Sequence, residues 1–475
     1  MAYCKFILMN LQLSFFKTGI CCLALCIAFS CKNKKFTSGE TETDPQKTIS
    51  GKPDFLVIIA DDAGWNDMSF HGSEIKTPHL DQLAGKGIQL ERFYVNPTCS
   101  PSRASLLTGM PASRIGIVAP ISGRSEKTLP DSIVTLPQAL KKADYQTALI
   151  GKWHLGLKPE NGPEAYGFDY SYGFLHGQID QYSHRYKNGD RSWHRQGEFI
   201  EEEGHATDLI TREALQWLDQ RDKGRPFFLQ LAYSAPHIPL QEPGQWKAPY
   251  DFIENRSRRD YAAAMSHLDN AIGKVLEHLD HLGRRENTVV LFISDNGAQE
   301  KWNPVTQYDG RYGPNDQLGS NHPLRDYKTS NYEGAIRVPA IIAWNGYAET
   351  GKLQHYMSVT DVMPTFLELA EVPVPEQVEG KSVHSILQKP SDQKNHEIYV
   401  RGHLQESLIQ KPWKLLRARH VNAPAVFELY DIEADPSERE NLIRKYPEVA
   451  EKMKRAMEQQ FRKDAKAVNV ALPGG

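Results

Sequence analysis

The stretch DFLVIIADD, residues 54–62, places two aspartates directly after a short apolar run. An apolar run of this length, bounded by polar residues, is typical of a buried strand in a parallel sheet. Three more runs end in the same way: YQTALIG before Lys152 and His154, PFFLQLAYSAP before His237, and TVVLFIS before Asp295 and Asn296. Helical patterns lie between them, so the order predicts an α/β fold with a mostly parallel central sheet flanked by helices.

The clearest helical pattern is residues 258–283, where apolar residues recur every three or four positions and Gly283 is expected to end the helix. A smaller C-terminal α+β subdomain is predicted from the possible strands HEIYVRG, WKLLRAR and VFELYD and the helix PEVAEKMKRAMEQQFRKD. We expect the large domain to span residues 52–389 and the subdomain residues 390–475.

The N-terminus has the features of an export signal. The apolar run TGICCLALCIAFS follows Lys17, has the length of a signal-peptide core, and is too short to span a bilayer. Small residues precede Cys31, as in bacterial lipoproteins, so we predict a leader over residues 1–31 with a lipid anchor at Cys31; a simple cleaved signal peptide is the alternative. Polar residues 32–51 are expected to form a flexible tether. The protein is therefore expected in the periplasm or anchored to the cell envelope.

The composition is that of a soluble globular protein. The chain has 475 residues, of which 40% are hydrophobic and 24% charged, and its formal net charge is -3. Binding to nucleic acid needs a broad basic surface, which this charge balance does not favour, so no nucleic-acid partner is expected.

The polar residues that follow the predicted strands are expected to form one site, because open α/β sheets bind ligands at the carboxyl ends of their strands. Taken singly, each has a structural explanation: the paired aspartates as a helix cap, His154 as a core histidine, SDNG as a turn. Together, the aspartates and the Asn296 carbonyl form an oxygen cluster suited to Ca²⁺ or Mg²⁺. Arginine and lysine side chains can hold an anionic group, and histidines can move protons.

Cys99 is the only cysteine after Cys31. Exported proteins usually form disulfides or lack cysteine, so a solitary one suggests a reactive group, with a small buried hydrophobe as the alternative. The surrounding TCSPSRASLLTG predicts a helix that begins near Cys99, with Pro101 in its first turn. A helix N-terminus attracts anions and favours a deprotonated thiol.

These residues resemble the type I sulfatases of the alkaline-phosphatase superfamily. The family signature C-x-P-S-R followed by L-T-G is met by Cys99, Pro101, Ser102, Arg103, Leu107, Thr108 and Gly109. The segments IADDAGWNDMSFHG, IGKWHLG, SAPHIP, ISDNG, LRDYKTSNYEGAIRVP and LYDIEADPSERENL are similar to the family's other site segments and its C-terminal subdomain. Ala335 stands where a second glycine is usual, a conservative departure. The resemblance implies an alkaline-phosphatase-like fold with a sulfatase catalytic domain over residues 52–389.

The resemblance also implies a mechanism. Cys99 would be oxidised by a formylglycine-generating maturation enzyme to 3-oxoalanine (formylglycine), whose hydrate is the nucleophile. Bound Ca²⁺, with Mg²⁺ as the alternative, would be held by Asp61, Asp62, Asp295, Asn296 and the Cys99-derived side chain. By the same resemblance, Arg103 and Lys152 steady the hydrate, His154 is the base for its collapse, and His237 with Lys328 binds sulfate and protonates the leaving alcohol.

The substrate expected is a sulfated polysaccharide or oligosaccharide, because residues 166–184 and 197–218 resemble the arylsulfatase B branch. Side chains expected to line the sugar subsite are Asp180, Tyr182, His184 and Arg185; an ordinary surface loop is the alternative. Two other functions stay open: a phosphodiesterase or phosphonate monoester hydrolase of the same superfamily, and a non-catalytic glycan-binding lipoprotein.

Overall fold

The computed structural model describes residues 51–344, 350–388, 396–420 and 423–466, which all belong to one compact unit. The predicted leader and residues 32–50 of the tether lie outside these residues, as does the expected domain boundary at residue 389, which stays a prediction. Among the described helices, none has the length and apolar character needed to cross a membrane.

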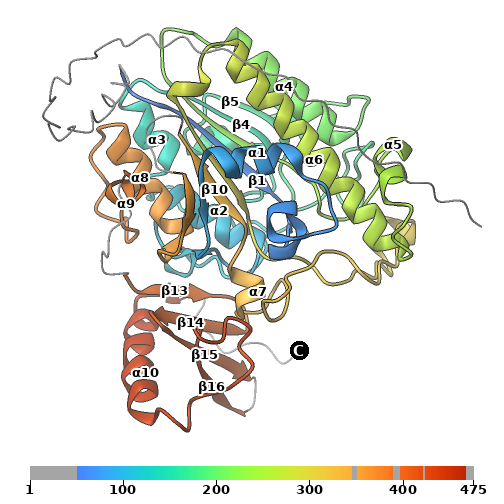
Figure 1. Ribbon diagram of the computed structural model, residues 1–475. Helices are drawn as coiled ribbons and strands as arrows, with labels where there is room; N and C mark the ends of the chain where they lie inside the picture. Colours follow the sequence, from blue (N-terminus) through green and yellow to red (C-terminus); the bar gives the residue numbers. More distant parts are fainter. Residues whose placement is uncertain (1–50, 345–349, 389–395, 421–422, 467–475) are drawn as a thin grey trace, which may run out of the picture. The chain divides into compact units, whose positions relative to one another are not determined.

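A ten-stranded sheet forms the centre of this unit (Figure 1), in the order β11-β2-β10-β9-β1-β8-β4-β5-β6-β7. Its strands are β1 (Asp54–Ala60), β2 (Ile88–Leu90), β4 (Gln146–Lys152), β5 (Tyr170–Phe174), β6 (Trp193–Arg195), β7 (Glu198–Phe199), β8 (Phe227–Ala232), β9 (Thr288–Ser294), β10 (Ala340–Ala343) and β11 (Gly351–Leu353). The four strands predicted from apolar runs are β1, β4, β8 and β9, and they pair in parallel. The α/β fold class is therefore confirmed. Among the described strands of this sheet, the antiparallel pairs are β10 with β2 and β9, and β6 with β5 and β7.

Helices cover both faces of the sheet (Figure 1). One face packs against α1 (Pro78–Lys86), α4 (Ala206–Gln220) and α6 (Arg256–His281), and the other against α2 (Cys99–Thr108), α3 (Leu136–Lys141), α8 (Val362–Leu369) and α9 (His384–Gln388). Alternate residues of β1 enter the two cores, which is why its whole apolar run is buried. The helix predicted over 258–283 is α6, and Gly283 follows it with a φ of +64° that suits glycine.

Shorter elements connect these layers. The remaining short helices and the small parallel pair of strands are α5 (Gly244–Lys247), α7 (Glu333–Ile336), β3 (Phe93–Tyr94) and β12 (Met357–Ser358). Short 3₁₀ helices are η1 (Trp65–Asp67), η2 (Ser69–His71), η3 (Ala112–Ile115), η4 (Pro159–Asn161), η5 (Pro163–Tyr166), η6 (Ala248–Tyr250), η7 (Arg285–Asn287), η8 (Gln307–Gly310) and η9 (Val359–Asp361).

The C-terminal part is a four-stranded antiparallel sheet of β13 (Ile398–Arg401), β14 (Gln405–Gln410), β15 (Trp413–His420) and β16 (Ala423–Asp431), packed against α10 (Pro447–Arg462). Three strands and the helix are those predicted. The fourth, β14, was missed because QESLIQ has only two apolar residues.

A buried ion cluster joins this small sheet to α7. The Lys414 ammonium on β15 lies 3.0 Å from Glu333, the first residue of α7, and 2.8 Å from Glu438. All three side chains are fully buried, so each charge depends on the others for stabilisation.

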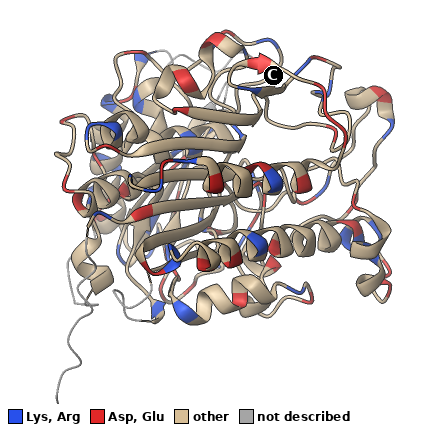
Figure 2. Ribbon diagram, turned by 90° about the horizontal axis from the view of Figure 1, so that it is seen from above, with Lys and Arg blue, Asp and Glu red and all other residues tan. Residues whose placement is uncertain are grey.

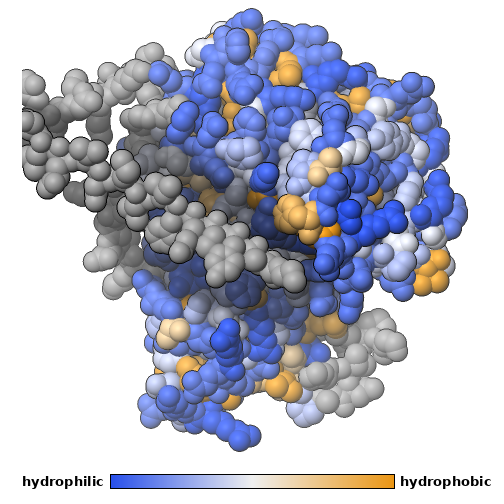
Figure 3. Space-filling model, turned by 45° about the vertical axis from the view of Figure 1, so that its right-hand side comes forward, coloured by the Kyte–Doolittle hydropathy of each residue, from blue (hydrophilic) through white to orange (hydrophobic). Residues whose placement is uncertain are grey.

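Charged residues of both signs are distributed along the described helices and loops. Figure 2 shows acidic and basic residues interspersed along the helices and loops, and on the face drawn in Figure 3 hydrophobic residues are scattered among hydrophilic ones. Such a mixed surface agrees with the charge balance of the sequence.

Candidate active site

The structure brings the ten predicted metal and catalytic residues together at the carboxyl ends of the central strands. Nine come from strand ends or from α2, and the tenth, Lys328, comes from the loop before α7. Each is linked to the others by a hydrogen bond or by lining the same cavity: Asp61, Asp62, Cys99, Arg103, Lys152, His154, His237, Asp295, Asn296 and Lys328. Adjacent parallel strands therefore deliver the polar residues that follow them to one place.

Each of the three aspartates is paired with a cation. Lys152 Nζ donates to Asp61 Oδ2 at 2.6 Å, and Lys328 Nζ donates to both oxygens of Asp62 at 2.7 and 2.8 Å. The Arg103 guanidinium donates twice to Asp295 Oδ2, at 3.0 and 2.7 Å. With three carboxylates against three cations, this group of six carries no net charge by itself.

The donor set fits a hard divalent cation such as Ca²⁺. Asp61 Oδ1 and Asn296 Oδ1 are buried and accept no hydrogen bond from the described residues, although buried oxygens normally do. Donor atoms of Asp61, Asp62 and His237 lie within 4.8 Å of one another. Burial, with the neighbouring Asp295 and Asp62, raises the pKa of Asp61 to about 7, a repulsion that a cation would relieve. A bound divalent cation would also make the charge-balanced site attractive to an anion.

Two of these residues have a strained backbone. Asp62 has a φ of +70° and His154 a φ of +59°, a region that side chains other than glycine rarely adopt. The Tyr261 hydroxyl donates to the Asp62 carbonyl at 3.0 Å, which helps to hold the first of these turns. Strain of this kind concentrates at functional sites.

Cys99 is the first residue of α2, as predicted, and Gly109 ends that helix with a φ of +65°. The expectation of a deprotonated thiol is not met. Burial, together with Asp295 and Asp61, raises the pKa of Cys99, although Lys152 and Lys328 oppose the shift. As a coded cysteine, this residue is therefore a weak nucleophile.

The two histidines present free ring nitrogens to the site. His154 Nε2 donates to the Ile121 carbonyl at 2.8 Å, which leaves Nδ1 buried without a partner among the described residues. His237 Nδ1 donates to the Ile238 carbonyl at 2.7 Å, so Nε2 carries the lone pair. Burial lowers the pKa of His154 well below its ordinary value and that of His237 to about 3. Both rings are therefore neutral and able to accept a proton.

Lys328 is the protonated group beside them. Although burial opposes it, the Asp62 carboxylate raises the pKa of Lys328 above its ordinary value. An ammonium in this position can hold an anion and donate a proton.

A cavity of about 280 Å³ opens onto Cys99, His154, His237 and Lys328. Beyond these, its polar and aromatic lining includes Gln178, Tyr186, Lys187, Gln299, Trp302 and Gln307. Amide groups that can bond hydroxyls, an indole ring and an ammonium suit a polar, anionic ligand.

The four residues expected around a sugar do not line this cavity. Asp180 accepts hydrogen bonds from the backbone of Tyr182 and from Gln241, His184 is buried against Trp193, and Arg185 pairs with Glu201. The side chains of Asp180, His184 and Arg185 bind the protein's own atoms, whereas the Tyr182 side chain is 45% exposed. The role of the four residues in substrate binding stays a prediction. The same segment reaches the cavity through Gln178, before these residues, and through Tyr186 and Lys187, directly after them.

Sequence reasoning missed the cavity residues because none of them follows a predicted strand. Trp302, Gln299 and Gln307 lie in the long loop between β9 and α7, which has no periodic pattern. The only signal was an aromatic residue among glutamines in GAQEKWNPVTQYDG.

Replacing Gly177 by alanine is expected to lower turnover about 100-fold, the loss that follows from displacing a catalytic group by about 1 Å. A Cβ at this position would overlap the His154 ring, so the imidazole must move. Steady-state kinetics with any accepted sulfate ester, alongside the melting temperature, tests this. Gly85→Ala is the matched control because its added Cβ meets no atom within 4 Å. Wild-type turnover in Gly177→Ala would show that the placement of His154 does not matter.

Known proteins share both the sequence and the fold. Residues 53–372 match the family model described as Sulfatase, and residues 321–464 match the model described as N-sulphoglucosamine sulphohydrolase, C-terminal. Arylsulfatase J of Mus musculus is 31% identical over 93% of this chain and 81% of its own length. N-acetylgalactosamine-6-sulfatase of Homo sapiens is 34% identical over 68% of this chain and 63% of its own length.

Solved structures agree. The crystal structure of Ps i-CgsB has a TM-score of 0.78 and 31% identity, covering 88% of this chain and 94% of that chain. The same protein in complex with k-i-k-neocarrahexaose matches equally well, at 30% identity.

Proposed function

Because this chain belongs to the sulfatase family, we propose that it removes sulfate from a sulfated carbohydrate with a nucleophile made from Cys99. It is a type I sulfatase of the alkaline-phosphatase superfamily, and so a sulfuric ester hydrolase. The observation that carries the proposal is the cavity in which Cys99 meets Lys328 and two neutral histidines. A thiol in this environment is protonated, so conversion to formylglycine by a maturation enzyme gives the position its reactivity.

The hydrate of that aldehyde would supply one hydroxyl to attack sulfur and a second whose deprotonation expels inorganic sulfate. His154 is suited to take that proton, because its Nδ1 is free and its other nitrogen is held by Ile121. Arg103 is held by Asp295 and by the Lys152 carbonyl at 2.8 Å, which keeps its charge next to the first turn of α2.

Bound Ca²⁺ would polarise the sulfate oxygens and orient the nucleophile. The residues that would hold it are Asp61, Asp62, Asp295 and Asn296, two of which have buried oxygens without a partner in the described structure. Lys152 favours the ionised form of Asp61, and Lys328 favours the ionised form of Asp62, whose pKa lies below its ordinary value.

The substrate class is supported by the cavity lining and by two relatives. N-acetylgalactosamine-6-sulfatase is named for a sulfated sugar, and Ps i-CgsB binds a neocarrahexaose. In this chain the Trp302 ring can pack against a sugar face, the glutamines can bond hydroxyls, and Lys187 can meet a second anionic group.

A panel of defined sulfated oligosaccharides tests the proposal, with an aryl sulfate and an aryl phosphodiester assayed beside it. We expect sulfate release from at least one oligosaccharide and much slower hydrolysis of the phosphodiester. Faster turnover of the phosphodiester would favour a phosphodiesterase or phosphonate monoester hydrolase. Oligosaccharide binding without any hydrolysis by the matured protein would favour a glycan-binding protein.

Lys328→Ala, which removes the protonated group, is expected to lower turnover of sugar sulfates by about 10² to 10⁴-fold, the contribution of a general acid, but to affect activated aryl sulfates less. His237→Ala is expected to act in the same direction, because the ring lies with Lys328 at Asp62 and its loss would displace that acid. A sugar alkoxide is a poor leaving group and needs a proton, whereas a phenolate does not. The ratio of kcat values on the two substrates gives the result. Equal losses on both would show that these residues only bind sulfate.

We also propose that the protein is exported, with lipidation at Cys31 anchoring it to the cell envelope. Fractionation of cells that make the wild type and Cys31→Ala tests this: the wild type should be in the membrane fraction and the variant soluble in the periplasm. Both proteins in the cytoplasm would exclude export.

A further inference from the structure

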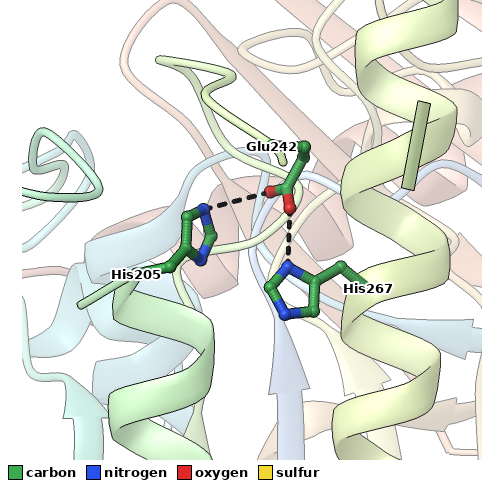
Figure 4. A group of neighbouring side chains, drawn as sticks. All are labelled: His205, Glu242 and His267. Carbon is green, nitrogen blue, oxygen red and sulfur yellow. Dashed lines mark hydrogen bonds and ion pairs between the residues drawn. The ribbon is translucent and has the colours of Figure 1, made fainter. Parts of the chain in front are cut away.

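A second group of buried polar side chains lies outside the catalytic cavity. His205 precedes α4, Glu242 lies in the loop after β8, and His267 is in the middle of α6. Figure 4 shows the Glu242 carboxylate between the two rings, with one oxygen toward each. Oε2 lies 2.6 Å from His267 Nδ1 and Oε1 lies 3.5 Å from His205 Nε2. One donor atom from each residue lies within 4.8 Å of the others.

The His205 ring provides an independent observation. It is 4% exposed, and its Nε2 faces Glu242 without a hydrogen bond to any described residue. A buried ring nitrogen is rarely left in this state, and here it is directed at the carboxylate that the second histidine also faces.

The surroundings fix the orientation of the second ring. His267 Nε2 lies 3.2 Å from Asp208 Oδ1, and the Trp246 ring stacks on His267 with centroids 4.8 Å apart. A carboxylate that holds the far nitrogen of a histidine is the usual support of a metal-ligating imidazole. Asp208 is about half exposed, so an ion can reach the group from solvent at this side.

We propose that His205 Nε2, His267 Nδ1 and the Glu242 carboxylate hold one Zn²⁺, with water as the fourth ligand. Two imidazoles and one carboxylate suit zinc, whereas the all-oxygen cluster next to Cys99 suits calcium. None of the three residues lines the catalytic cavity, so this site is separate from the proposed hydrolytic function.

In the protein without the ion, His267 Nδ1 and Glu242 Oε2 face each other at 2.6 Å, so a proton lies between them. Zinc takes the place of this proton. When His205 binds zinc through Nε2, the proton of its neutral ring must lie on Nδ1. Nδ1 then loses the 3.3 Å hydrogen bond that it accepts from the Thr207 amide.

The ion would join three segments that are far apart in the sequence. Because it binds only when the start of α4, the loop after β8 and α6 are in place, it stabilises the folded state by mass action. The melting temperature should therefore rise with zinc and fall again with a chelator.

The test uses the full chain, stripped with a chelator and then kept in excess Ca²⁺ so that the oxygen cluster is occupied. One equivalent of Co²⁺ should give the intense d–d absorption of a four-coordinate site with nitrogen ligands, and one equivalent of Zn²⁺ should abolish it. Glu242→Gln and His267→Ala should lose the band. His281→Ala, an exposed histidine at the end of the same helix, should keep it, as should Asp295→Asn in the oxygen cluster.

Absence of the band from the wild type, or a band unchanged in Glu242→Gln, would overturn the proposal and leave the group as a hydrogen-bonded network. The wild-type measurement decides the question even if a variant fails to fold. Loss of the band in Asp295→Asn but not in Glu242→Gln would place cobalt at the oxygen cluster and would likewise overturn it.

Discussion

Cys99→Ala is expected to abolish sulfate ester hydrolysis, with a loss on the order of 10⁶-fold, the size seen when a catalytic nucleophile is removed. The fold should survive, because alanine fills most of the same buried space and the thiol has no disulfide. Turnover of an aryl sulfate, measured on protein made with a competent maturation enzyme, checks this.

Cys99→Ser tests whether the nucleophile must be an aldehyde hydrate or whether an ordinary hydroxyl is enough. Unless the host converts serine, the variant should also be inactive, because one hydroxyl can accept the sulfuryl group but no second hydroxyl expels it. Mass spectrometry of the wild type should show the active-site peptide lighter by the change from thiol to aldehyde, and that peptide should react with hydrazides. A fully active protein with an unmodified thiol would refute the mechanism.

Asp295→Asn is expected to lower turnover about 10³-fold and to weaken Ca²⁺ binding, because the amide removes one anionic oxygen ligand. It also leaves the buried Arg103 guanidinium without its carboxylate, so stability should fall by about 3 to 5 kcal/mol. Activity, calcium titration and urea unfolding together give the result.

The control for stability is Asp190→Asn, which breaks an exposed Arg–Asp pair. The Arg124 side chain in that pair is 80% exposed, so the cost should stay below about 1 kcal/mol. A variant at position 295 that binds Ca²⁺ like the wild type would exclude a ligand role for Asp295.

The central strands and the site residues that follow them could be predicted from sequence for one physical reason. A fully buried parallel strand is apolar throughout, so the polar residues that follow it, such as Asp61 or Asn296, stand out against it. Parallel order then brings these residues to one edge without any knowledge of loop paths. Cys99 and Arg103 could be predicted together because both lie near the start of one helix.

The rest depended on tertiary packing. Tyr186, Lys187 and Trp302 reach the cavity from irregular loops, and no local pattern states where such a loop runs. Likewise, Glu242 and His267 meet His205 only because a loop and two helices pack together. Burial also raises the pKa of the Cys99 thiol, whereas its place at a helix start had predicted a lower one, and the degree of burial is a property of the whole fold.

The buried ion cluster of Lys414, Glu333 and Glu438 limits which parts of this enzyme can be exchanged with those of its relatives. Glu333 begins α7 five residues after Lys328, and Gly297 next to Asn296 donates its amide to the Ala335 carbonyl within α7. A chimera that takes its C-terminal sheet from another sulfatase therefore needs a basic residue at the position of Lys414. Without one, Glu333 would be a buried unpaired charge next to the loop that carries Lys328. Tyr186 and Lys187 line the cavity from a segment far from α7 in the sequence, so exchange of specificity is better attempted there than by swapping the end of the chain.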